Sequence, residues 1–284
     1  MDDPIAPEGP AADWLGGRLA ILGGGNIGLA LARGLVAAGL YSADRVTITR
    51  RQASLLADAR SEGYTVHTDN HDAVRSARIV VIAVQPQQLE DLLHQVRGDL
   101  LPDRHLLISL VSGVLISEIH RHLGFAVPVV RAMPNTAIAI RESMTCLSSN
   151  VPTGDALTTA AALFDAVGKT LVIPEELMIP ATALCACGVA FFLRSIRAAS
   201  QGGTEIGFHP HEALLLAAQT AKGSAALLLA APGHPESEID KVTTPRGCTI
   251  AGLNRMEHEG FSSAMIKGIT TSAAKAARLY VRHE

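Results

Sequence analysis

Residues 19–173 alternate short apolar runs with longer amphipathic stretches, and this alternation predicts parallel strands connected by helices. The run at 79–84 is apolar at every position, as is typical of a central strand buried on both faces. Ligands of such sheets lie beyond the carboxyl ends of the strands, so we expect 83–86, 110–113 and 133–136 around one crevice. Strands are expected at 19–22, 46–50, 64–67, 79–84, 105–110, 127–131, 144–149 and 170–173, and helices at 26–38, 52–61, 87–96, 115–122 and 153–166.

The pattern changes after Pro174, where the strand signal ends and Ala- and Leu-rich helical periodicity begins. The segments 181–200 and 211–230 are apolar nearly all round, and a helix with this pattern needs cover on every face. A second copy of the chain would supply that cover, so we expect a homodimer or a higher homo-oligomer built from dimers. The predicted fold is therefore α/β: a Rossmann-type doubly wound sheet over 18–173, then an all-α helical substrate-binding and dimerisation domain over 174–284. Breaks between its helices are expected at 202–203, 209–210 and 232–235.

Composition excludes several classes of protein. Hydrophobic residues make up 48% of the chain, charged residues 18%, and the net charge is −3, so nothing indicates a nucleic-acid partner. We expect no apolar run long enough to cross a membrane. Residues 1–17 are acidic and rich in Pro and Gly, and we interpret them as a disordered leader without the features of a signal peptide. The four cysteines have neither zinc-type spacing nor the pattern of a disulfide framework, which predicts no metal site and a cytoplasmic location.

The first chemical signal is a glycine pattern between the first strand and the first helix. Gly23, Gly25 and Gly28 have the spacing G-x-G-x-x-G, with an apolar run before them and a helical stretch after them. In a dinucleotide-binding turn the first glycine allows the tight bend, the second lets the pyrophosphate approach the backbone, and the third lets helix and strand pack closely. The phosphates then lie against the free N–H groups of a helix start. The sequence thus predicts a dinucleotide site.

The end of the second strand indicates which dinucleotide binds. An NAD site usually carries Asp or Glu about 20 residues after the glycines, to hold the ribose 2′-hydroxyl. This chain has Arg50 and Arg51 there. Guanidinium groups match a 2′-phosphate in charge and in the geometry of their donors. We therefore predict NADPH, with NADH as the alternative cofactor.

A second signal lies at 242–253, which reads Val-Thr-Thr-Pro-Arg-Gly-Cys-Thr-Ile-Ala-Gly-Leu. Pro245 and Gly247 mark a turn, and Thr249 opens an apolar helix. The hydroxyls of the threonines and the backbone N–H groups of a helix start could bind a small carboxylate. From the residues alone, an ordinary helix cap that follows a turn explains the segment as well.

The chain resembles the Δ1-pyrroline-5-carboxylate reductase family from about residue 18 onward. The likeness covers the glycine loop, the Ala-Val-Gln-Pro exit at 83–86, Val-Ser-Gly at 111–113, Met-Pro-Asn-Thr at 133–136 and, most specifically, 243–252. The resemblance implies reduction of the cyclic imine Δ1-pyrroline-5-carboxylate to L-proline, with NAD(P)H as the cofactor. It implies cofactor contacts at Leu22, Gly23, Gly24, Gly25, Asn26, Ile27, Gly28, Arg50, Arg51, Asn70, Ala83, Val84, Gln85, Pro86, Leu110, Val111, Ser112 and Gly113. For the substrate it implies Thr244, Arg246, Gly247, Cys248 and Thr249, and the Thr249 hydroxyl would lie near the imine nitrogen as the catalytic group.

Three departures from the family pattern leave other readings open. Gln85 stands where the family usually has Lys, thiols replace hydroxyls in the segment 185–190, and Arg246 replaces a glycine of a Pro-Gly-Gly turn. A reductase of another cyclic imine acid, such as a six-membered ring, and a nucleotide-binding relative without catalysis are the alternatives. A β-hydroxyacid dehydrogenase would need a catalytic Lys in the helix after the Rossmann domain, and 181–200 contains Arg194 and Arg197 but no Lys.

Overall fold

The computed structural model describes residues 14–150, 154–230 and 233–278. The chain forms two compact units, the first holding residues up to Ala186 together with those from Ser272 onward, and the second Cys187–Thr271. We describe each unit by itself.

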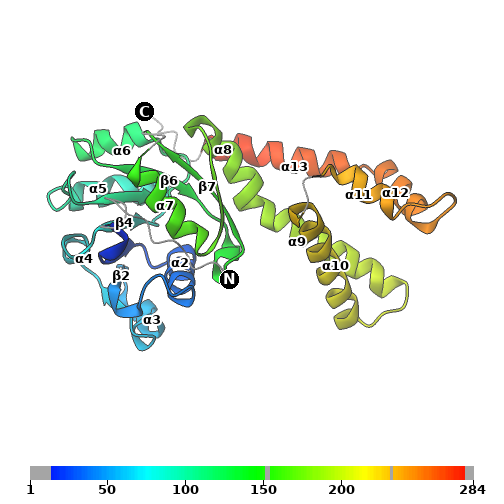
Figure 1. The fold of residues 1–284 in the computed structure, drawn as a ribbon, viewed down its shortest axis with the longest axis horizontal. Coiled ribbons are helices and arrows are strands. Elements are labelled where there is room, and N and C mark those ends of the chain that lie inside the picture. The colour runs from blue at the N-terminus through cyan, green and yellow to red at the C-terminus, as the bar shows by residue number, and fades with distance from the viewer. Residues whose placement is uncertain (1–13, 151–153, 231–232, 279–284) are drawn as a thin grey trace. The chain divides into compact units, whose positions relative to one another are not determined.

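The first unit is built on one eight-stranded sheet with the strand order β3-β2-β1-β4-β5-β6-β7-β8 (Figure 1). All neighbouring strands pair in parallel except β6 and β7, which are antiparallel. The predicted doubly wound sheet is therefore confirmed, and every predicted strand is present with its ends moved by at most two residues. The strands are β1 Leu19–Leu22, β2 Val46–Thr49, β3 Thr65–His67, β4 Ile79–Ile82, β5 Leu106–Ser109, β6 Val129–Met133, β7 Ser143–Ser149 and β8 Gly168–Val172.

Helices cover both faces of the sheet, and the alternation of side chains along β1 shows how. Leu19 and Ile21 belong to a buried cluster with residues of α2 and α7. Ala20 and Leu22 belong to a second buried cluster with residues of α4, α5 and α6. A strand with helices on both sides has no polar face, which explains its continuous apolar sequence. The helices are α2 Asn26–Ala37, α3 Ala57–Ser61, α4 Asn70–Ser76, α5 Leu89–Val96, α6 Ile116–Leu123, α7 Asp155–Asp165 and α8 Met178–Ala181.

The first unit extends further in the sequence than the predicted 18–173. Met178 and Ala181 pack in a small buried cluster with Met133 and Cys146, so the segment after β8 belongs to this unit although it has no strand. At the other end, the Trp14 indole N–H donates to the carbonyl of Arg104 at 3.2 Å. Residues 14–17 are therefore ordered rather than part of a leader, and 1–13 lie outside the described residues.

The Arg131 guanidinium on β6 lies 3.1 Å from a Glu175 carboxylate oxygen, and its side chain is 2% exposed. The same oxygen accepts from the backbone N–H of Ile116, at the start of α6, at 2.8 Å. One carboxylate thus joins three segments that are far apart in the sequence.

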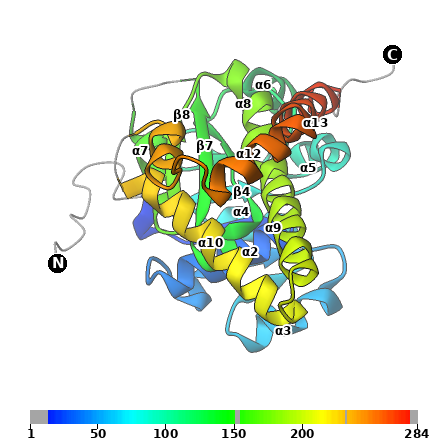
Figure 2. The same ribbon diagram turned by 90° about the vertical axis from the view of Figure 1, so that its right-hand side faces the viewer.

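In the second unit every regular element of the described residues is a helix, as predicted (Figure 2). The predicted break before Pro210 is present, but the break at 202–203 is wrong because α9 continues to Glu205. A side chain at Gly203 would put its Cβ 3.0 Å from the Cβ of Ala213, so this glycine allows α9 and α10 to approach closely. The helices are α9 Gly188–Glu205, α10 Pro210–Ala230, α11 Pro235–Lys241, α12 Cys248–His258 and α13 Phe261–Ala276, the last of which ends in the first unit.

Two helical stretches are long and apolar enough to cross a membrane by length and composition, contrary to our expectation. They are Glu175–Glu205, with mean hydropathy 1.9, and Pro210–Ala230, with mean hydropathy 1.4. Only 28% and 6% of their most apolar windows are buried within the single chain. Such a pattern is also typical of helices that a partner subunit covers, so it is weak evidence for a membrane.

Candidate functional site

The glycine loop between β1 and α2 can be formed only with glycine at two of its positions. Gly23 has a φ of +118°, and a Cβ there would lie 2.5 Å from the carbonyl oxygen of Ala83 at the end of β4. A Cβ at Gly28 would lie 2.3 Å from the carbonyl oxygen of Gly23. The first glycine therefore lets two parallel strand ends meet, and the third lets α2 pack against the loop, as the spacing predicts.

Gly25 differs because a Cβ added to it would meet no atom within 4 Å. It is the N-cap of α2, and it offers no side chain to bond the first N–H groups of the helix. Those groups have no partners within the helix, and the helix dipole makes this end favourable for an anion. The open space beside Gly25 leaves room for a phosphate to reach them.

A cavity of about 610 Å³ opens at this loop, at the carboxyl ends of β1, β2 and β4. Two-thirds of its lining was predicted: ten of the fifteen residues are among the proposed cofactor contacts. These are Leu22, Gly23, Gly24, Gly25, Arg50, Arg51, Asn70, Ala83, Val84 and Gln85. A smaller cavity of about 250 Å³ shares Arg51, Asn70, Val84, Gln88 and Leu92 with it, so both belong to one region of the surface.

The two arginines border the cavity at the end of β2. The Arg50 guanidinium donates to the carbonyl of Gly24 at 3.0 Å, which anchors it at the glycine loop. Arg51 is exposed and lines both cavities. The cavity thus has two cationic side chains in its lining at the end of β2, and guanidinium groups are suited to binding a phosphate.

Asn70, at the start of α4, forms side-chain hydrogen bonds to both β2 and α5. The Thr49 hydroxyl donates to its side-chain oxygen at 2.6 Å, and its amide donates to Gln95 on α5 at 2.8 Å. Five lining residues were not predicted from the sequence, three at or just after the ends of β2 and β3 and two before or within α5. The rule that ligands lie at carboxyl ends of strands could have found Thr49, Gln52 and Thr68, whereas Gln88 and Leu92 become visible only once α5 is placed.

Eight predicted cofactor contacts do not line this cavity. Asn26, Ile27 and Gly28 lie in the first turn of α2 and are not among the residues that line the cavity. Leu110 and Val111 follow β5 and are 9% and 2% exposed, which leaves their side chains little surface for a ligand. Pro86, Ser112 and Gly113 complete the set, and all eight stay predictions.

In the second unit, residues 244–247 form a tight turn directly before α12. The backbone N–H of Gly247 donates to the carbonyl of Thr244 at 2.9 Å, and Arg246 has a φ of +60°. Proline followed by a residue with positive φ is the arrangement of a type II turn, which favours glycine at the position of Arg246. A Cβ at Gly247 would lie 2.5 Å from the Thr244 hydroxyl, so the turn is also closed to a larger residue there.

The turn presents the start of α12, which begins at Cys248. Gly247 is its N-cap and provides no side-chain bond, so the first N–H groups of the helix have no partners within it. Thr249 is half-buried, while Thr244, Arg246 and Cys248 are exposed. The Thr243 hydroxyl, in contrast, donates to the carbonyl of Ile239 at 2.7 Å, so its proton is already engaged in a hydrogen bond within the protein.

Two family models match the regions that contain these two features. The model described as NADP oxidoreductase coenzyme F420-dependent matches residues 18–113, and the model described as pyrroline-5-carboxylate reductase dimerisation matches residues 175–279. The chain is 47% identical over 277 residues to pyrroline-5-carboxylate reductase 2 of Dictyostelium discoideum, and the match covers 92% of each. The chain belongs to the pyrroline-5-carboxylate reductase family.

Two further comparisons agree. The chain is 53% identical over 278 residues to pyrroline-5-carboxylate reductase 1 of the same organism, which covers 94% of this chain and 50% of that protein. The chain thus spans half the length of that relative. A solved structure of Plasmodium falciparum pyrroline carboxylate reductase with NADP bound has a TM-score of 0.84 at 23% identity, covering 93% of this chain and 98% of the other, and shares the fold. The resemblance and fold class predicted from the sequence are confirmed, and residues 18–113 form an NADP oxidoreductase-type domain.

The segment in which thiols replace the family's hydroxyls has an irregular backbone. Thr182–Cys187 form a π-helical turn between α8 and α9, and such turns are frequent at functional sites. The Cys185 sulfur lies 3.7 Å from that of Cys146 on β7, and the Asn135 amide donates to the carbonyl of Cys185 at 3.3 Å. The hydrogen bond between the thiols lowers the pKa of Cys185 to about 7, against the effect of burial, and raises the pKa of Cys146.

Proposed function

We propose that this protein reduces Δ1-pyrroline-5-carboxylate to L-proline with NADPH. The observation that carries the proposal is the cavity at the glycine loop bordered by Arg50 and Arg51, in a chain that belongs to the reductase family. In the reaction a hydride adds to the imine carbon and a proton to the nitrogen, so the C=N bond becomes a C–N bond and NADPH becomes NADP⁺. NADPH supplies the hydride when it is bound, and the protein supplies position and electrostatics.

The first unit is proposed to hold the cofactor. The open space at Gly25 and the free N–H groups of α2 suit the pyrophosphate, and the two arginines suit the 2′-phosphate. Asn70 and Gln85 offer polar groups at the cavity wall.

The turn before α12 is proposed to bind the substrate. Its carboxylate would accept from the N–H groups of Cys248 and Thr249, where the helix start favours a negative charge, and from the Thr244 hydroxyl. The Thr249 hydroxyl would orient the ring nitrogen. An imine that is protonated in solution is already electrophilic, so the protein needs no strong acid and its main contribution is the orientation of the ring.

The apolar surface of the second unit supports the proposal of a homodimer. A groove of about 730 Å³ lies against α9 and α10, and Phe192, Phe208 and Leu216 are among its lining. Leu215 and Leu229, also on α10, are 70% and 77% exposed in the single chain. A second copy is the proposed cover, because the family model that matches 175–279 is one of dimerisation. The cysteines are free thiols, which agrees with a cytoplasmic location.

Purified full-length protein, NADPH and a panel of cyclic imine acids test the activity, followed by the absorbance of the nicotinamide. We expect turnover of the five-membered acid with NADPH above that with NADH. Preference for a six-membered cyclic imine acid would change the proposed substrate but leave the proposed reaction, the reduction of an imine, unchanged. Tight NADPH binding without turnover of any member would overturn the proposal and favour a nucleotide-binding relative without catalysis.

A further inference from the structure

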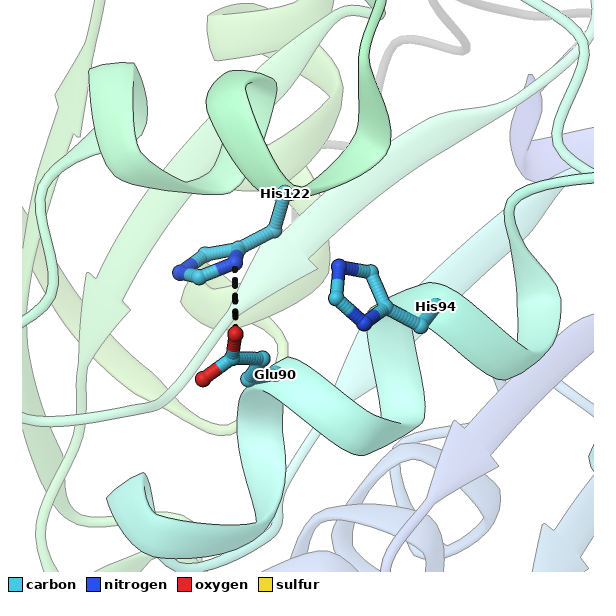
Figure 3. A group of neighbouring side chains, drawn as sticks. All are labelled: Glu90, His94 and His122. Atoms are coloured by element: carbon cyan, nitrogen blue, oxygen red, sulfur yellow. Dashed lines mark ion pairs between the residues drawn. The ribbon is translucent and has the colours of Figure 1, made fainter.

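Two histidines and a glutamate lie together on the helical layer of the first unit, outside the lining of the cavities described above. Glu90 and His94 are one turn apart on α5, so they share a face of that helix. His122 comes from α6, and Figure 3 shows the three side chains pointing toward one another across the two helices. The sequence gives no hint of the cluster, since its members come from two helices separated by a strand.

The donor atoms are close enough to share a ligand. His122 Nδ1 lies 3.7 Å from Glu90 Oε1, and one donor atom from each of the three residues lies within 4.8 Å of the others. The two imidazole rings have centroids 5.8 Å apart and meet edge to face. Donors on a tetrahedral Zn²⁺ are about 3.4 Å apart, given bonds of 2.0–2.2 Å. The distances between the donor atoms therefore need to shorten by up to about 1.4 Å, which rotations about χ angles can supply.

The surroundings are those of a partly open site. His122 is 8% exposed, Glu90 is half-buried and His94 is exposed. The opposite face of α5 packs Leu89, Leu93 and other apolar side chains into the core, so the backbone that carries Glu90 and His94 is held in place. Two ligands on a fixed helix and a third on its neighbour make a preformed arrangement with room for solvent on the His94 side.

We propose that Glu90, His94 and His122 bind a divalent transition metal ion, with Zn²⁺ the best match. Two imidazoles and one carboxylate are ligands that Zn²⁺ takes with a water in the fourth position. The ion would join α5 to α6. Because Leu92 on α5 also lines the cavity at the glycine loop, the metal would stiffen one wall of that cavity. The site is separate from the chemistry of imine reduction.

The test is a Zn²⁺ titration of full-length protein, stripped of metal with a chelator, against a competing zinc indicator. We expect one bound Zn²⁺ per chain, and at least about tenfold weaker binding in His94→Gln and in Glu90→Gln, since even groups that only support a ligand contribute 10- to 100-fold. The matched control is His209→Gln combined with His211→Gln, which removes a second pair of neighbouring histidines. This control should leave the affinity unchanged.

Co²⁺ provides a second readout that does not depend on affinity alone. Bound in a site with imidazole ligands, it should give visible absorption bands that His94→Gln abolishes. Circular dichroism of each variant confirms that it is folded, and His94 is suited to this because it is exposed. Unchanged Zn²⁺ affinity in both ligand variants, or loss of binding in the control, would overturn the proposal, as would the absence of any stoichiometric binding to the wild-type protein.

Discussion

Arg246 holds a backbone conformation that glycine adopts at much lower cost. Its φ of +60° lies in the left-handed region, where a side chain costs about 1–2 kcal/mol. The resemblance places a glycine of the family's turn at this position, and the positive φ of Arg246 is the backbone conformation that glycine favours.

Arg246→Gly should stabilise the protein by about 1 kcal/mol, because relief of strain outweighs the extra freedom of the unfolded chain. If the guanidinium contacts the substrate carboxylate, the same variant should raise the KM for the imine acid at least tenfold. Urea unfolding and steady-state kinetics measure the two effects. A gain in stability without a change in KM would make Arg246 a residue of the turn only.

Thr249→Val tests the proposed orientation of the imine nitrogen. Valine keeps the branched shape at the start of α12 and removes only the hydroxyl. We expect kcat to fall about 10- to 1000-fold, the range for one positioned polar group, with unchanged affinity for NADPH. Turnover equal to that of the wild type would exclude Thr249 from the mechanism.

Replacement of both Arg50 and Arg51 by Ala should weaken the use of NADPH by about 10- to 100-fold and affect NADH little. The lost charge-assisted hydrogen bonds contribute about 1.5–3 kcal/mol. Comparison of kcat/KM for the two cofactors measures the change in preference. Equal losses with both would indicate damage to the glycine loop, to which Arg50 is bonded.

At the scale of elements, the sequence predicted strands better than helices. Central strands such as β4 are apolar on both faces, so composition alone identifies them. The helix α4 was missed because it has only seven residues, and its N-cap bond from His71 N–H to the Asp69 side chain is a local signal that periodicity does not detect. The break expected at 202–203 was wrong because Gly203 lies where α9 and α10 pack closely together. The sequence pattern of one helix does not reveal such a contact with another.

The Glu175 carboxylate connects the segment after β8 to β6 and to the start of α6. The sequence did not reveal these contacts. Glu175→Gln removes the carboxylate that pairs with the buried Arg131 but keeps an acceptor for the Ile116 N–H. We expect a loss of about 2 kcal/mol in the free energy of unfolding, less than for a fully buried pair because Glu175 is partly exposed. Urea denaturation measures it. Its exposed neighbour provides the control, Glu176→Gln, and equal stability of the two variants would refute a structural role for the ion pair.

At the scale of the whole molecule, the sequence predicted a part with a sheet followed by a helical part. It did not predict the residue at which the first compact unit ends. Apolar periodicity separates strands from helices near residue 174, whereas the compact unit continues to Ala186. The reason is tertiary: Met178 and Ala181 pack beside β7, and this contact becomes visible only in three dimensions. The cofactor loop could be located from its glycines, but Gln88 and Leu92 depend on where α5 lies.

Leu215→Arg tests the proposed homodimer. Leu215 is 70% exposed in the single chain, so a charge there should cost little unless a second copy covers it. We expect monomeric or aggregated protein by sedimentation and light scattering. The control is Leu101→Arg, a 51% exposed leucine outside the region that the dimerisation model matches. A folded dimer of Leu215→Arg, or an active wild-type monomer at high dilution, would contradict the proposal.

The nearly uncovered α10, with 6% of its apolar window buried, has a consequence for how the protein is made. If a second copy covers this surface, as proposed, a newly synthesised chain carries it uncovered from the ribosome until it meets another chain, and the rate of that encounter grows with the square of the number of free chains. During this interval chaperones and membrane-targeting factors recognise the same hydropathy. The yield of active enzyme per chain synthesised should therefore rise with the level of expression, and a chain that cannot pair should be degraded rather than accumulate.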